Sequence, residues 1–164
     1  MESEIIKYFN QNVRDNVWTK NGSKFKKWFK RQLKHLLVEI EENSTEKELN
    51  AFMYRLGLGY WGIGKQKGIF SGIKTEDAIL NKNTNDHVFG VVEIGRFVHQ
   101  ELIKNNLDVD YMVNEWLYNH LWLWMTIKVS IEEHKKDNII RNKHTIEEKK
   151  ELRHYQKISN LIFL

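Results

Sequence analysis

The sequence contains no cysteine and no proline, and it has no long hydrophobic run. Without cysteine the chain can form neither a disulfide nor a thiolate zinc site, and it has no cysteine nucleophile. The start of the chain, residues 1–4, is acidic and lacks the apolar segment of a secretory signal, so we expect a cytoplasmic protein. The densest apolar stretch, residues 121–127, is far too short to span a bilayer, and we therefore expect no membrane partner.

Aromatic residues, in contrast, are plentiful: the 164 residues include 6 Trp, 6 Tyr and 8 Phe. Each aromatic side chain buries a large area, so a chain of this length can build a stable core. No repeat and no low-complexity linker divides the sequence. We predict a single domain over residues 1–164, with a basic helical N-terminal part at 1–60.

Charge is distributed unevenly along the chain. Residues 1–34 hold nine basic and three acidic residues, a net charge of +6, and residues 135–164 hold eight basic and four acidic, a net of +4. The intervening residues 35–134 carry nine basic and fifteen acidic residues, a net of −6. This pattern favours a polyanion-binding surface built from the two ends, and a solvated lysine-rich surface is the alternative.

Hydrophobic periodicity predicts a mostly helical α+β protein with a small two-stranded β element. Residues 125–130 alternate, contain β-branched side chains and form the clearest strand. A turn is predicted at 21–23, with Ser23 as a helix N-cap, and a polar loop at 81–85. The segments predicted to be helical are 3–17, 24–42, 45–56, 74–80, 93–103, 109–121, 131–140 and 145–158.

Two helix starts carry a specific signal. Thr45 and Glu48 fit the capping-box pattern, as do Ser130 and Glu133 directly after the predicted strand. Basic residues follow both the turn at 21–23 and this second helix start, and phosphate contacts need only such point charges. The residues expected to contact nucleic acid are Lys24, Lys26, Lys27, Lys30, Arg31, Lys34, Lys135 and Lys136.

Residues able to do chemistry occur at two places that are far apart in the sequence. Asp86 and His87 stand at the end of a polar segment, and His134 stands in the first turn of the helix that follows strand 125–130. If the chain folds these places together, Asp86 and His134 could hold one divalent cation, Mg²⁺ or Mn²⁺, with open positions for phosphate oxygens. His87 could then take a proton from a water attacking a phosphodiester, because histidine titrates near neutral pH.

These residues carry a resemblance to a known family. Residues 84–88 (TNDHV) followed by 126–136 (TIKVSIEEHKK) resemble the HNH group of His-Me finger (ββα-metal) nucleases, in particular members from phages and mobile elements. The resemblance implies a ββα-metal-like core within residues 74–140, with Asp86 and His134 as metal ligands and His87 as the general base. It implies a hydrolase, an endonuclease of the HNH or homing type, that acts on DNA in a bacterial or phage-infected cell.

The sequence also departs from the family pattern. A helical insertion separates the two halves of the motif, and Phe89-Gly90 stands where a proline is common. The middle asparagine of the motif has no single match; the candidates are Asn105, Asn106, Asn114 and Asn119.

Other interpretations stay open at the level of sequence. Asp86 could cap a turn, His87 could be a structural histidine, and His134 could lie on a solvated helix face. The chain could then be a nucleic-acid-binding protein without catalysis, on DNA or on RNA. It could also be a protein-interaction module or homo-oligomer that uses the tryptophan-rich segment around Trp116, Trp122 and Trp124.

Overall fold

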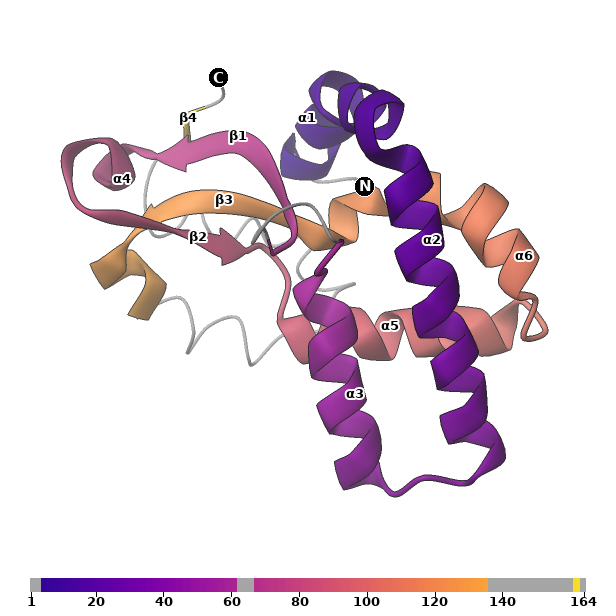
Figure 1. The fold of residues 1–164 in the computed structure, drawn as a ribbon. Helices are drawn as coiled ribbons and strands as arrows, with labels where there is room; N and C mark the ends of the chain where they lie inside the picture. The colour runs from indigo at the N-terminus through magenta and orange to yellow at the C-terminus, as the bar shows by residue number, and fades with distance from the viewer. Residues whose placement is uncertain (1–3, 62–66, 136–160, 163–164) are drawn as a thin grey trace.

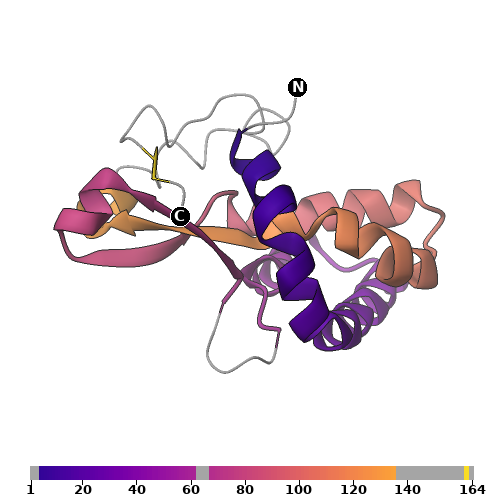
Figure 2. The same cartoon turned by 90° about the horizontal axis from the view of Figure 1, so that it is seen from above.

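A computed structural model describes residues 4–61, 67–135 and 161–162 of the protein. The fold is α+β and mostly helical, with a small mixed sheet at one end of the molecule and the longer helices at the other (Figures 1 and 2). The helices predicted for residues 136–140 and 145–158 lie outside the described residues. Within the described ranges, no helix has the length and hydropathy needed to cross a membrane.

The N-terminal part consists of α1 (Glu4–Asn12) and the long α2 (Arg14–Glu41). The predicted turn at 21–23 is wrong, because α2 runs through these residues without a break. Gly22 is buried there, and a Cβ at this position would lie 3.2 Å from ring atoms of Trp18, one turn earlier. The glycine therefore makes room for an indole ring and does not end the helix.

Helices α3 (Glu46–Leu58) and α5 (Val91–Lys104) pack against each other at very close range. A Cβ on Gly57 would lie 1.8 Å from the carbonyl oxygen of Val91, and a Cβ on Gly95 would lie 2.4 Å from that of Met53. The two glycines thus allow backbone-to-backbone contact. The predicted capping box is confirmed at the start of α3, where Thr45 accepts from the backbone N–H of Glu48 and the Glu48 carboxylate accepts from that of Thr45.

The sheet is larger than the predicted two-stranded element. It contains β1 (Ile69–Thr75), β2 (Asn83–His87), β3 (Met125–Ser130) and β4 (Leu161–Ile162), in the order β2-β3-β1-β4. β3 pairs with β1 in parallel and with β2 in antiparallel, and β4 pairs with β1 in antiparallel. Strand 125–130 is confirmed. The loop predicted at 81–85 is wrong from Asn83 onward, because pairing with β3 makes a strand of a polar segment of low β-propensity.

Shorter helical segments complete the fold. α4 (Glu76–Leu80) connects β1 to β2, and it confirms the helix predicted at 74–80 from Glu76 onward, whereas Lys74 and Thr75 belong to β1. The helix predicted at 109–121 is formed by α6 (Val109–Tyr111), the π-helix η1 (Met112–Trp116) and α7 (Leu117–Asn119), and the 3₁₀ helix η2 (Leu121–Trp124) leads into β3.

The tryptophans gather in the core that joins helices and sheet. Trp124 is fully buried, and its ring centroid lies 5.1 Å from that of Trp61 and 5.8 Å from that of Phe29. Trp116 and Trp122 are buried as well. These side chains therefore stabilise the monomer, and an oligomer would have to use other surfaces.

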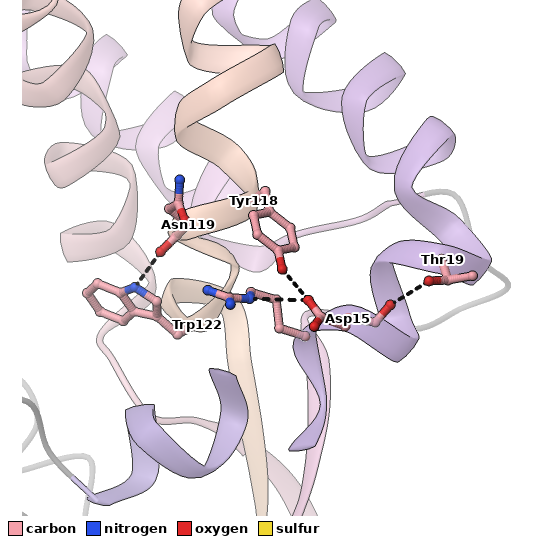
Figure 3. A network of polar contacts seen from close by, with 6 residues as sticks. Asp15, Thr19, Tyr118, Asn119 and Trp122 are labelled. Atoms are coloured by element: carbon pink, nitrogen blue, oxygen red, sulfur yellow. Dashed lines mark hydrogen bonds and ion pairs between the residues drawn. The ribbon is translucent and has the colours of Figure 1, made fainter. Parts of the chain in front are cut away.

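A polar network ties the start of α2 to α7 (Figure 3). The Tyr118 hydroxyl donates to Asp15, whose backbone carbonyl accepts from Thr19 at 2.8 Å. The guanidinium of Arg14 lies 4.3 Å above the Tyr118 ring. The hydrogen bond to Asp15 raises the pKa of Tyr118, because it stabilises the protonated phenol.

Candidate functional site

The structure places Asp86 and His134 side by side. The Oδ1 atom of Asp86 lies 3.2 Å from Nδ1 of His134, although the two residues belong to separate halves of the chain. Asp86 is only 3% exposed, whereas the His134 side chain is 35% exposed. The ring of His134 thus reaches solvent in part, whereas its Nδ1 atom, which faces Asp86, is buried.

Local structure on either side explains this contact. β2 and β3 pair in antiparallel, with Asp86 opposite Ile127, and the chain turns into a helix over residues 131–135 directly after β3. The capping box predicted at this turn is confirmed: Ser130 Oγ accepts from the backbone N–H of Glu133 at 3.1 Å, and Glu133 Oε1 accepts from the backbone N–H of Ser130 at 2.9 Å. The cap fixes the direction in which the first turn, and with it His134, leaves the sheet.

The strand register shows which face of the sheet this turn covers. Asp86 on β2 shares a face with its partner Ile127, and Val129 lies two residues further along the same face. Thr75 on β1 follows Lys74, the partner of Lys128, and so falls level with Val129. The turn after Ser130 therefore lies over β3, with contacts to β2 on one side and to β1 on the other.

Glu133 makes the contact on the β1 side. Its Oε1 atom accepts from Thr75 Oγ1 at 2.5 Å, and the residue is 7% exposed. Thr75 Oγ1 in turn accepts from the backbone N–H of Ala78 and caps α4. The sequence signals Glu133 through its capping box, but nothing in the sequence signals the contact with Thr75.

His87 points elsewhere, because neighbouring side chains leave a strand on opposite faces. Its Nε2 atom lies 3.2 Å from the backbone carbonyl oxygen of Leu58 in the last turn of α3, and the residue is 9% exposed. A carbonyl can only accept, so Nε2 carries the hydrogen, and Nδ1 is the acceptor nitrogen of the neutral ring. Gly68 leaves room for the ring, since a Cβ there would lie 2.9 Å from Nε2.

The Asp86–His134 pair fits a small divalent cation. Although the two atoms are 3.2 Å apart, Nδ1 of His134 has no hydrogen-bond partner among the described residues, so its N–H direction misses the carboxylate. When two ligand atoms each lie about 2.1 Å from one ion, and the angle between them at the ion is octahedral or tetrahedral, the two atoms are about 3.0–3.4 Å apart. The carboxylate oxygen suits Mg²⁺ and Mn²⁺, whereas an imidazole nitrogen is a ligand more typical of Zn, Cu, Fe and Ni.

The protein offers few ligands at this place. Among residues 4–61, 67–135 and 161–162, no three His, Cys, Asp or Glu side chains stand close enough to hold one ion together. An ion held by Asp86 and His134 would keep its remaining positions for water or phosphate oxygens. Of the candidate asparagines, Asn105 and Asn119 donate to helix carbonyls of Glu101 and Glu115.

The predicted basic residues lie mostly on one surface. Lys24, Lys27, Lys30, Arg31 and Lys34 of α2 are all exposed. Lys26 is half-buried, with its Nζ atom 5.6 Å from the centroid of the Trp18 ring. Lys135, next to His134, is exposed, and Lys136 lies outside the described residues.

Four of these residues, together with Lys20, lie along one side of α2. Successive residues of an α-helix are about 100° apart around its axis. Five basic side chains of α2 lie within about 40° of their common mean direction, which is opposite the buried side of the helix: Lys20, Lys24, Lys27, Arg31 and Lys34. We refer to these five residues as the basic stripe. It extends about 21 Å along the helix at 1.5 Å per residue.

No family model, curated protein or solved structure matches this chain. The function is therefore inferred from the geometry of the site and from the basic stripe.

Proposed function

We propose that the protein is a metal-dependent endonuclease of the HNH type that hydrolyses phosphodiester bonds in DNA. The observation that carries this proposal is the 3.2 Å approach of Asp86 Oδ1 to His134 Nδ1 across two antiparallel strands and a following helix. A strand pair and a helix around one ion is also the arrangement that the sequence resemblance implies. The buried carboxylate supplies a fixed negative charge, and burial strengthens its attraction for a cation.

Asp86 and His134 would hold the cation, Mg²⁺ or Mn²⁺. When bound, such a cation withdraws charge from a phosphoryl oxygen and stabilises the charge that develops during hydrolysis. His134 must be unprotonated at Nδ1 to act as a ligand, so cation binding competes with the proton at this nitrogen.

In this proposal His87 would act as the general base, although its side chain leaves β2 on the face opposite Asp86. The carbonyl of Leu58 fixes the tautomer and presents Nδ1 as the basic nitrogen. β2 ends at His87, and residues 86–90 are all buried. To take the proton from the attacking water, His87 would have to become accessible from the side of the cation when substrate binds.

The basic stripe would hold the nucleic acid backbone. Five cations in a line of about 21 Å match a polyanion and need no base contact for affinity. They would position the substrate without selecting a sequence.

The proposal predicts cleavage of supercoiled plasmid by the purified protein with Mg²⁺ or Mn²⁺ and none with EDTA. Asp86→Asn and His134→Ala should reduce the rate about 100-fold or more, because each removes a cation ligand. His87→Ala should reduce it about 100- to 10,000-fold, the usual contribution of a general base. Cleavage is followed by gel electrophoresis, and circular dichroism shows whether each variant folds.

His35→Gln is the matched control, because His35 lies on α2 and contacts Glu39 rather than the site. This variant should cleave like the wild type. A wild-type protein that leaves plasmid and RNA intact with every divalent cation tested would refute the enzymatic proposal.

The basic stripe favours a second function, binding of nucleic acid without catalysis. In that case the protein binds DNA with affinity that falls steeply with salt, while cleavage is absent and Asp86→Asn leaves binding unchanged. The nuclease proposal expects both binding and cleavage.

A further inference from the structure

Glu133 is the buried acid of the site that the proposed mechanism does not use. One of its carboxylate oxygens, Oε1, accepts from Thr75 and from the backbone of Ser130. The other, Oε2, is buried and has no hydrogen-bond partner among the described residues. An acceptor on a buried carboxylate that makes no hydrogen bond is unfavourable, so the atom is suited to a donor that is not part of the protein.

The position of Glu133 points to the cation site as the source of this donor. Glu133 and His134 are adjacent in the first turn of the helix, and this turn covers the face of the sheet that carries Asp86 and Thr75. β1 and β2 flank β3, so Thr75 and Asp86 lie on strands about 10 Å apart. Oε1 of Glu133 is held at Thr75 on β1, and Asp86 stands on β2, at the other side of β3.

Glu133 is too far from the pair to share the ion directly. No three acidic or histidine side chains among the described residues stand close enough to hold one metal. A water bound to the ion could bridge the gap to Glu133. Such a water lies about 2.1 Å from Mg²⁺ or Mn²⁺, and it donates a hydrogen bond to an acceptor about 2.7 Å away. A cation with only two protein ligands keeps several waters, each of which needs an acceptor.

From these observations we infer that Oε2 of Glu133 accepts a hydrogen bond from the hydration shell of the divalent cation held by Asp86 and His134. This inference rests on the proposed function. Glu133 thus has two roles through its two oxygens: Oε1 fixes the turn that carries His134, and Oε2 adds negative charge and an acceptor on the β1 side of the ion. Partners of this kind commonly change metal affinity 10- to 100-fold.

Glu133→Gln separates the two roles. A capping box accepts glutamine in place of glutamate, so the amide oxygen can keep the bonds made by Oε1. The amide NH₂ then replaces Oε2, which removes both the charge and the acceptor. We expect Glu133→Gln to weaken Mn²⁺ binding to the full chain about 10-fold or more, measured by electron paramagnetic resonance of free Mn²⁺ or by calorimetry.

The chain offers a matched control in its other capping box. Glu48→Gln makes the same chemical change at the start of α3, where the box is exposed and away from Asp86. This variant should bind Mn²⁺ like the wild type. Thermal unfolding followed by circular dichroism should show that both glutamine variants keep the wild-type midpoint within a few degrees.

The outcomes distinguish this inference from the proposed function. A Glu133→Gln protein that binds Mn²⁺ as tightly as a binding-competent wild type shows that Glu133 is a cap and no more. A wild type that binds no Mn²⁺ refutes the cation site and the role of Glu133 together. If Glu133→Gln does not fold, Glu133→Asp keeps the charge but is one methylene shorter and withdraws both oxygens; unchanged Mn²⁺ affinity in that variant overturns the inference.

Discussion

At the scale of single residues, the protein buries ionisable side chains in places where their charge must be compensated. Asp86 and Glu133 are both inside the protein, and removing a carboxylate from water costs several kcal/mol unless partners replace the water. For Glu133, the backbone N–H of Ser130 and the hydroxyl of Thr75 supply part of this compensation. A divalent cation at the proposed site would supply more.

His99 on α5 provides a prediction about pH. Burial lowers the pKa of His99, since it disfavours the charged imidazolium. The unfolded chain, with a histidine pKa near 6.5, therefore takes up the proton first as the pH falls. The stabilisation by neutral His99 is complete above about pH 6.5 and is lost progressively below it.

We expect the free energy of unfolding to decrease from about pH 7.5 to about pH 5.5, and His99→Gln to make this decrease smaller. Urea titrations at several pH values measure both. An equal slope in wild type and variant would show that His99 does not contribute.

At the scale of elements, the closest contact in the fold is the one between α3 and α5. Gly57 and Gly95 bring the two helix backbones together, and the last turn of α3 presents the Leu58 carbonyl to His87. β2 leads into α5 through residues 88–90, so the same packing that joins the helices also places the end of β2. The position of the proposed base therefore depends on a helix contact remote from the metal pair.

Gly95→Ala tests this contact. A Cβ at residue 95 would lie 2.4–2.7 Å from atoms of Met53, two of them backbone atoms, so the helices must separate. We expect a loss of about 2 kcal/mol or more in the free energy of unfolding, despite the better helix propensity of alanine. Chemical denaturation measures the loss.

Gly22→Ala is the comparison for this prediction. The new Cβ there would lie 3.2 Å from the Trp18 side chain, which can shift, and alanine gains about 1 kcal/mol in helix propensity. The net change in the free energy of unfolding should be much smaller for Gly22→Ala than for Gly95→Ala. Equal effects of the two substitutions would argue against the backbone contact.

At the scale of the whole molecule, the sheet with the acidic site and the long helix with the basic stripe occupy different ends of the fold (Figure 1). The basic surface can therefore attract a polyanion without neutralising Asp86 and Glu133. Because the two surfaces are separate, substitutions in the basic stripe should change the attraction of a polyanion without changing the residues of the proposed site.

Removing two charges from the basic stripe should reduce nucleic acid binding in a salt-dependent way. For the double variant Lys27→Ala with Arg31→Ala, we expect the slope of log affinity against log salt concentration to become shallower by about 1.8, because each lost phosphate contact removes about 0.9. Fluorescence anisotropy with a labelled duplex measures this slope.

Lys47→Ala with Lys104→Ala removes two exposed charges from α3 and α5 and serves as the control. It should keep the wild-type slope. Equal slopes in all three proteins would remove the basic stripe from the binding surface.

Several features of this protein are determined by short stretches of sequence. The apolar stripes of α2 and α5, the capping boxes at Thr45 and Ser130 and the alternating strand at 125–130 all follow from residues that are neighbours in the chain. The resemblance of the motif also predicts that Asp86 and His134 lie together, and the structure places them 3.2 Å apart. Their role in holding a cation stays a prediction.

Only the tertiary structure decides the rest. The polar residues of β2 become a strand because β3 offers hydrogen-bond partners, and Gly22 stays helical because Trp18 packs over it. His87 meets the Leu58 carbonyl, and Glu133 meets Thr75, through segments that are distant in sequence. Local propensity amounts to a fraction of a kcal/mol per residue, whereas burial and hydrogen bonding between distant segments contribute more, so the folded partners determine where these side chains point.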